Sequence, residues 1–405
     1  MTPKKPSNPS RRSLLKALSS WFALQSVANL FPSKALALVA ARLPRARPKT
    51  AWHFWGNNLS GNFGNNLNSN SQSSPVSVFS AVVWQDLAGG GDLTGNIGYF
   101  TAGIKKNGTL WSFGRNSHGQ LGVGTLTDTS SPVQVGSATN WADVYGSFSR
   151  YNLGLRTDGS LYAWGQNPEG NLGDGTLSVR SVPVQVSGTW STIAAGYLHT
   201  LGIKSDGTLW GWGAANSGQV GNGAVGVSIS TPVQILSGST FIKIAAGHSS
   251  SFAIKTNGTL WAWGTNSEGQ IGNGVTDALK YSTPVQVGAL TTWADVKTGG
   301  SAVFAKKTDG TYWCWGYNGD GQLGIGTTSG KSSPVQFPGT TWSTILPSWG
   351  FTVGLKNDGT LYAWGDGGDG VLGAGSTVGV STPVQIAGTW QNVFVGPRHA
   401  GALKL

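Results

Sequence analysis

The feature that most constrains the fold is a sevenfold repeat. An aromatic residue followed by glycine ends a strand-like segment seven times, at intervals of 48 to 58 residues. The pairs are Trp55-Gly56, Phe113-Gly114, Trp164-Gly165, Trp212-Gly213, Trp263-Gly264, Trp315-Gly316 and Trp364-Gly365. A Pro-Val dipeptide follows each pair, and then an aromatic residue with an aliphatic one three places later. Three markers recurring together predict structural units that pack side by side.

Each repeat has the pattern of antiparallel β-structure. In residues 199–213, Leu201 and Ile203 alternate with small or polar residues, and a second strand with two tryptophans follows. Asp206-Gly207 lies between them and predicts a two-residue hairpin turn with positive φ at both positions. Equivalent dipeptides are Asn107-Gly108, Asp158-Gly159, Asn257-Gly258, Asp309-Gly310 and Asp358-Gly359.

Only six such turns exist for seven repeats, and the two ends of the chain account for the seventh. Residues 401–405 match the strand before the turn, and residues 50–56 match the strand after it. We therefore expect an all-β, seven-bladed β-propeller with four-stranded blades. One blade is built from both chain termini and closes the ring, so that no sheet edge is left free.

The N-terminal segment has the pattern of an export signal. Arg11-Arg12 precedes a moderately apolar stretch and the small-x-small sequence Ala35-Leu36-Ala37, as in twin-arginine signals. The stretch is too polar for a stable membrane span. The predicted organisation is an export signal over 1–37, a basic linker over 38–49 and the propeller over 50–405. The expected location is the periplasm, the cell surface or the medium of a bacterium.

The charge distribution argues against nucleic acid as a ligand. Ten of the 27 Lys and Arg residues lie within residues 1–49, which contain no acidic residue. The remaining 17 basic residues face 16 acidic ones, so the propeller lacks the basic surplus that phosphate binding requires. The single cysteine, Cys314, excludes an intrachain disulfide.

The candidate binding site is the set of turns between the first two strands of the repeats. Their side chains differ from repeat to repeat, whereas the surrounding pattern is constant, and in a propeller all these turns emerge on one face. Trp, Tyr and Arg carry much of the energy in protein interfaces. The predicted partner-binding residues are Tyr99, Phe100, Arg150, Tyr151, Tyr197, His199, His248, Trp349, Phe351, Arg398 and His399.

The markers resemble the repeats of the regulator-of-chromosome-condensation (RCC) family, in particular its secreted bacterial members. Gly196, His199 and Thr200 match the glycine and His-Thr of that repeat, and residues 116–122, 266–272 and 318–324 match its Asn-x-x-Gly-Gln-Leu-Gly loop. The resemblance covers residues 50–405. It implies a propeller that works through protein partners, which in the family include a small GTPase, chromatin and β-lactamase-type enzymes. A nuclear exchange activity fits poorly with an export signal.

The sequence thus predicts a monomeric protein-binding module that is not an enzyme and needs no cofactor or metal. The acidic residues fall mostly in hairpin turns, and no nucleophile with its base or facing carboxylate pair is evident. The five histidines lack metal-ligand spacing, although a degenerate enzyme with a metal at the axis is a third hypothesis. The second hypothesis is a cell-surface glycan-binding propeller whose loop aromatics stack on sugar rings.

Overall fold

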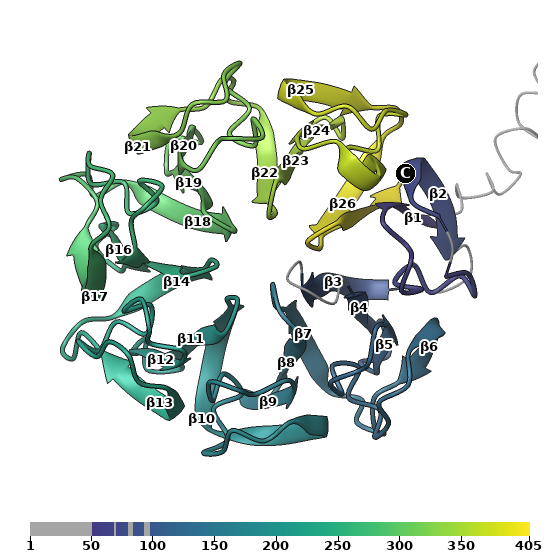
Figure 1. The fold of residues 1–405 in the computed structure, drawn as a ribbon, viewed down its shortest axis with the longest axis horizontal. Coiled ribbons are helices and arrows are strands. Elements are labelled where there is room, and N and C mark those ends of the chain that lie inside the picture. The colour runs from purple at the N-terminus through teal and green to yellow at the C-terminus, as the bar shows by residue number, and fades with distance from the viewer. Residues whose placement is uncertain (1–50, 69, 80–83, 93–97) are drawn as a thin grey trace, which may run out of the picture. The chain divides into compact units, whose positions relative to one another are not determined.

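The computed structural model describes residues 51–68, 70–79, 84–92 and 98–405, which form a ring of seven β-blades (Figure 1). In each blade the first strand lies nearest the axis and the fourth lies at the rim. All strand pairs within the blades are antiparallel. The predicted propeller with four-stranded blades is therefore confirmed. The predicted export signal and linker lie outside the described residues.

The strands follow one another in blade order. The blade made from both chain ends comprises β26 (Trp390–Val395), β27 (His399–Lys404), β1 (Ala51–Gly56) and β2 (Gln72–Phe79). The next two are β3 (Trp84–Asp92), β4 (Gly98–Lys105), β5 (Leu110–Gly114) and β6 (Thr129–Gln134), then β7 (Trp141–Gly146), β8 (Tyr151–Arg156), β9 (Ser160–Gly165) and the first part of β10 (Arg180–Ala195).

The remaining four blades repeat this order. They are the second part of β10 with β11 (His199–Lys204), β12 (Leu209–Gly213) and β13 (Ile229–Ile235); β14 (Phe241–Ala246), β15 (Ser250–Lys255), β16 (Leu260–Thr265) and β17 (Lys280–Gln286); β18 (Trp293–Gly299), β19 (Ala302–Lys307), β20 (Tyr312–Gly316) and β21 (Lys331–Gln336); and β22 (Trp342–Pro347), β23 (Phe351–Lys356), β24 (Leu361–Gly365) and β25 (Val380–Ile386). A short 3-10 turn, η2 (Gly368–Gly370), precedes β25.

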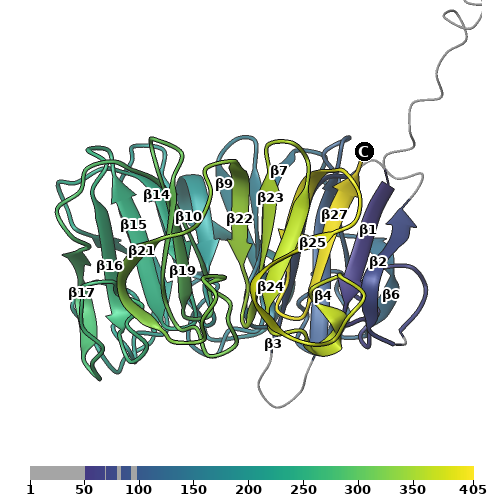
Figure 2. The same cartoon turned by 90° about the horizontal axis from the view of Figure 1, so that it is seen from above.

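Two strands, β10 and β1, make connections that the strands of the other blades do not make. Strand β10 is continuous and pairs with β9 through its first half and with β11 through its second half, so it belongs to two blades. Strand β1 pairs with β27 from Ala51 opposite Lys404 to Gly56 opposite His399. The two strands lie side by side in Figure 2. This pairing confirms that the seventh hairpin is formed by the two chain ends.

The six Asp/Asn-Gly turns are hairpins of a different type from the one predicted. The N–H of Gly207 donates to Lys204 O (2.9 Å) and the N–H of Lys204 donates to Thr208 O (3.0 Å), which defines a three-residue loop. Only the glycine has positive φ (82°). The Asp206 carboxylate instead accepts hydrogen bonds from Thr208 N and Oγ1. A type I turn closed by a left-handed glycine fits this pattern, because Asp then needs no strained backbone.

Tryptophan side chains hold neighbouring blades together. The indole N–H of Trp164 donates to Gln120 O of the preceding blade (3.0 Å), and the equivalent bonds measure 2.8–3.0 Å. The other five donors are Trp55, Trp212, Trp263, Trp315 and Trp364. Phe113 takes this position in the remaining blade and packs against Phe79 and Trp84. Each aromatic-Gly pair therefore forms part of a blade-to-blade contact.

The end of the propeller that carries the Asp/Asn-Gly turns holds a ring of cations stacked on aromatic rings. Lys204 Nζ lies 3.4 Å from the ring centroid of Trp210, and Lys307 Nζ lies 3.7 Å from that of Trp313. The same position is occupied by Lys105, Arg156, Lys255, Lys356 and Lys404, each over at least one aromatic ring. Seven basic side chains are thus placed at the end opposite the predicted binding turns.

Candidate functional site: the loop face

We call the other end of the propeller the loop face. It consists of the turns between the first and second strands and the loops between the third and fourth strands. The residue after each aromatic-Gly pair donates its N–H to a carbonyl oxygen in the neighbouring turn, as Gln166 does to Arg150 O (2.8 Å). A Cβ on Gly165 would lie 2.4 Å from the same oxygen, so this position requires glycine. The repeat therefore fixes the backbone of the turns while their side chains vary.

The structure divides the eleven predicted site residues into two groups. Six side chains are buried, with at most 1% of their surface exposed: Tyr99, Phe100, Tyr151, His199, Phe351 and His399. These six begin or lie within second strands and point into the blades, so they cannot touch a partner directly. The half-buried Arg150, Tyr197, His248, Trp349 and Arg398 precede those strands and remain as the candidate surface.

The buried histidines and tyrosine connect neighbouring blades. Tyr151 OH donates to His199 O of the next blade (2.8 Å). Ser251 Oγ donates to Gln219 O and therefore accepts from His199 Nε2 (2.9 Å), which leaves His199 Nδ1 without a proton. Burial lowers the pKa of His199 to about 3, and burial does the same for His399. Both histidines are thus neutral structural groups.

Three of the remaining residues form an aromatic row across the face. The rings of Tyr197 and His248 stack with centroids 4.5 Å apart and an interplanar angle of 27°. The ring of Trp349 meets His248 edge-on at 5.0 Å and 78°. The intervening turn contains Gly300, which has no side chain to separate the two rings. Backbone bonds from Tyr197 N to Gly247 O and from His248 N to Gly300 O tie these turns together (3.1 and 2.9 Å).

Arg150 belongs to a separate, charged cluster. Its guanidinium lies 2.9 Å from Asp92 Oδ2, and both side chains are largely buried, at 12% and 6% exposure. It also lies 3.3 Å from His118 Nε2. Burial, together with the charges of Arg150 and Arg115, lowers the pKa of His118. A buried ion pair of this kind fixes the positions of its two turns but leaves little of Arg150 for a partner.

Arg398 pairs with Asp366, and this pair leads to a group of residues that the sequence analysis missed. The carboxylate of Asp320 lies beside Gly350, where a Cβ would be 3.3 Å from its Oδ2. Burial raises the pKa of Asp320, and the neighbouring Asp366 raises it further. Asp320 and Asp366 lie in loops between third and fourth strands, where the sequence analysis identified only the repeating Asn-x-x-Gly-Gln pattern and predicted no site residue.

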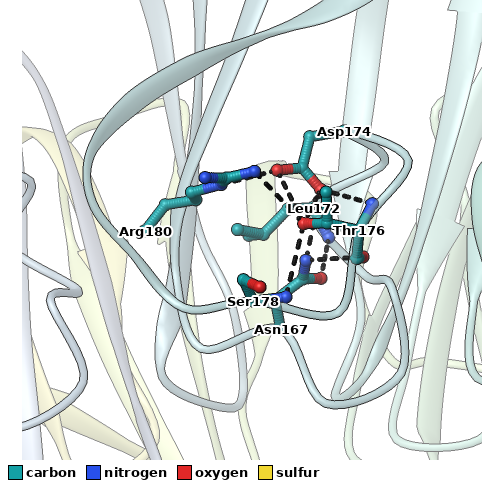
Figure 3. A network of polar contacts seen from close by, with 6 residues as sticks. All are labelled: Asn167, Leu172, Asp174, Thr176, Ser178 and Arg180. Atoms are coloured by element: carbon teal, nitrogen blue, oxygen red, sulfur yellow. Dashed lines mark hydrogen bonds and ion pairs between the residues drawn. The ribbon is translucent and has the colours of Figure 1, made fainter.

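The loops themselves are rigid because they are closed by their own side chains (Figure 3). In the loop between β9 and β10, Asn167 accepts a hydrogen bond from Leu172 N (3.0 Å) and donates to Thr176 O (2.9 Å). Arg180 Nε donates to Asp174 Oδ2 (2.7 Å), and Asp174 also accepts from Thr176 N. The residues between these anchors, such as Glu169, are thereby held at the face.

Two pockets in the described part of the chain lie between blades and not on the aromatic row. One of about 370 Å³ is lined by Trp210, Lys204 and Pro232, and one of about 320 Å³ by Trp313, Trp293 and Pro334. They occupy equivalent blade boundaries. In the part of the chain that the structure describes, no group of three or more His, Cys, Asp or Glu residues is placed to hold a metal, and no helix is long and apolar enough to cross a membrane.

Comparison with known proteins agrees with this architecture. Residues 152–404 match the RCC1-like domain model, and residues 107–146 match the model of the regulator of chromosome condensation (RCC1) repeat. The fold and the face define a propeller of the protein-binding scaffold class. Because the domain model covers more than half of the sequence, the chain belongs to the RCC1-like domain family.

Individual relatives are more distant. The chain is 28% identical over 239 residues to the ultraviolet-B receptor UVR8 of Arabidopsis thaliana, covering 57% of this chain and 54% of the receptor. It is 31% identical over 232 residues to the probable E3 ubiquitin-protein ligase HERC6 of Homo sapiens, covering 56% of this chain and 18% of the ligase. The matched region is thus about half or less of these relatives' length.

Two solved structures share the fold. Human WBSCR16 superposes with a TM-score of 0.76 at 20% identity, covering 88% of this chain and 98% of that one. Prp20p of Saccharomyces cerevisiae, whose binding to Gsp1p and histones has been described, superposes with a TM-score of 0.74 at 18% identity, covering 89% and 92%. At these identities the likeness establishes the fold alone.

Proposed function

We propose that this protein is an exported propeller that binds a partner protein through its loop face and thereby inhibits or scaffolds that partner. The observation that supports the proposal most is the aromatic row of Tyr197, His248 and Trp349, which crosses four neighbouring turns and takes a ring from three of them. Aromatic side chains held in place lose little conformational entropy on binding and are frequent energetic centres of interfaces. The proposed location rests on the twin-arginine pattern at Arg11-Arg12.

Membership of the family supports a protein as the ligand. Yeast RCC1 (Prp20) has been solved in complex with Kap60, so another propeller of this fold does engage protein partners. The pair Arg150–Asp92 is less suited to binding, since its side chains are already largely buried against each other. The expected energetic centre is therefore Trp349, with Tyr197 contributing through the same row.

The test is a pull-down from periplasmic and surface extracts with the full chain. The variant Trp349→Ala/Tyr197→Ala should lose a partner that the parent protein retains. The matched control is Leu290→Ala, which removes an exposed apolar side chain (44% exposed) next to the Asp/Asn-Gly turns. If the double variant retains every partner and the Leu290→Ala control loses one, the binding site lies at the opposite end of the propeller.

A further inference from the structure

The loop face carries a surplus of negative charge, although the propeller as a whole is nearly neutral. Nine of the 16 carboxylates lie at this end, against six of the 17 basic residues of the propeller. The carboxylates are Asp92, Asp128, Glu169, Asp174, Glu268, Asp277, Asp320, Asp366 and Asp369, and the cations are Arg115, Arg150, Arg180, Lys280, Lys331 and Arg398. The surplus follows from the cation ring at the other end, which places seven basic residues there.

The arginines of the loop face are already neutralised. Arg115 pairs with Asp128, Arg150 with Asp92, Arg180 with Asp174 and Arg398 with Asp366. Among the described residues, five carboxylates of this face have no ion-pair partner, namely Glu169, Glu268, Asp277, Asp320 and Asp369. The cations without a carboxylate partner, Lys280 and Lys331, begin rim strands. The charge without an ion-pair partner at this end is therefore mainly negative, five carboxylates against two lysines, although the exposed Lys297 lies on β18 three residues before Gly300.

One of these carboxylates adjoins the row directly. Asp320 lies against Gly350, the residue after Trp349, and its own loop carries Tyr317, which is 36% exposed. The loop of Glu268 lies against this loop, since a Cβ on Gly330 would be 4.0 Å from Glu268 O. Burial raises the pKa of Tyr317, and the charges of Asp320 and Glu268 raise it further. An indole, a phenol and two carboxylates without an ion-pair partner are thus carried by neighbouring turns and loops of the face.

We propose that the patch formed by Trp349, Tyr317, Asp320 and Glu268 receives an arginine or lysine side chain of the partner protein. A cation is attracted by the faces of aromatic rings and by unpaired carboxylates, and both attractions act at this patch. A partner with an acidic surface would instead meet like charge, which opposes association. This inference rests on the proposed function: it specifies the chemistry of the partner at the same face.

The test uses a defined probe, fluorescein-labelled hexa-arginine, with the full chain at low ionic strength. Fluorescence polarisation should show binding that Asp320→Asn/Glu268→Gln weakens by about tenfold, whereas the affinity for hexa-glutamate, which the ten basic residues of 1–49 attract, should not fall in this variant. The control Asp206→Asn/Asp309→Asn removes two carboxylates from the opposite end and should leave the affinity unchanged. Trp349→Leu, which keeps an apolar side chain but loses the π-face, should weaken binding by about threefold.

Equal binding of hexa-arginine by the loop-face and control pairs, or an equal loss of affinity for both peptides in the loop-face pair, would overturn the inference. That result is separable from failure of the proposed function. If Trp349→Ala/Tyr197→Ala loses the partner while Asp320→Asn/Glu268→Gln binds hexa-arginine normally, the face is right and the basic partner is wrong. If the double aromatic variant keeps every partner, the proposed function fails whatever the peptide does. Thermal melts of each variant exclude loss of binding through unfolding.

Discussion

The indole ring of Trp349 packs edge-on against the imidazole of His248, with ring centroids 5.0 Å apart, although their turns are separated by an entire blade. The contact is possible because the intervening turn presents Gly300. It joins two positions of the loop face that sequence comparison of the repeats treats as independent. The aromatic row thus depends on four blades, three that supply the rings and one that supplies the glycine, and not on any single repeat.

The first prediction concerns the ionisation of His248. Burial lowers its pKa, and Trp349 covers part of the ring. We therefore expect Trp349→Ala to raise the pKa of His248 towards its ordinary value, because the charged form becomes better hydrated. NMR titration of the histidine resonances measures this directly. The pKa of His199 is the internal control and should not move, because it is buried within a blade.

The comparison of sequence and structure separates what the repeat encodes from what it does not. The seven aromatic-Gly pairs and the missing hairpin predicted the closed ring correctly, since both depend on local residue types that any blade must share. The same periodicity placed the variable turns on one face. It did not distinguish Trp349 from Phe351, or Arg150 from Tyr151, because a shift of one or two residues where a turn enters a strand decides which side chain is buried.

The charged part of the face was missed for a related reason. Asp320 and Asp366 lie 29 and 32 residues from Trp349 and Arg398 respectively, in loops whose repeating amides do serve a structural role. Gln322 Oε1, for example, accepts from Asp320 N (3.1 Å). The structure shows that one loop can close its own turn and still present a side chain to the face. Proximity across blades cannot be inferred from one repeat alone.

The second prediction concerns the bond between blades. Trp212→Phe keeps the ring but removes the N–H that donates to Asn171 O (3.0 Å), so a buried carbonyl loses one partner. We expect the free energy of unfolding in urea to fall by about 1–3 kcal/mol. Trp390→Phe is the matched control, because Trp390 is also buried (2% exposed) and its indole N–H has no hydrogen-bond partner among the described residues, so it should cost less. Equal losses would show that ring size and not the hydrogen bond matters.

The third prediction is a dependence of stability on pH. His199 and His399 have pKa values lowered to about 3 in the folded chain, whereas unfolding returns them to about 6.5. Between these values the unfolded state binds more protons, so stability decreases as the pH falls below about 6.5. Each histidine contributes about 1.4 kcal/mol per pH unit within that window. Urea midpoints at pH 7.5 and 5.5 should therefore differ.

The variant His199→Gln/His399→Gln provides the control for this effect. The Gln amide N–H can replace the imidazole Nε2–H that donates to Ser251 and Thr101. The Gln side chain has no proton to take up in this pH range. The difference between the urea midpoints at pH 7.5 and 5.5 should therefore be smaller in this variant. An unchanged difference would assign the pH dependence to the carboxylates instead.

The fourth prediction concerns the ion pair of the loop face. Arg150→Met leaves Asp92, which is 6% exposed, without its cation. We expect a loss of about 3 kcal/mol in the free energy of unfolding, because removing one partner of a largely buried ion pair is costly. Arg150→Met combined with Asp92→Asn should recover most of that loss. If the single and the double variant are equally unstable, the packing of Arg150 and not its charge holds the turn.

The last prediction tests the closure of the ring. Ala51 pairs with Lys404, and the N–H of Leu405 donates to Thr389 O (2.9 Å), as the N–H of Ser205 does to Thr189 O (3.1 Å) in a complete hairpin. The two chain ends therefore occupy the geometry of a turn.

A permuted chain that joins Leu405 to Ala51 through Asp-Gly, with new ends between Asp206 and Gly207, should fold and melt cooperatively. Removing residues 399–405 from the original chain should instead abolish the cooperative transition, because β1 and β26 then lose the strand that both pair with. Differential scanning calorimetry distinguishes the two chains, and a permuted protein that fails to fold would show that closure needs more than the paired strands.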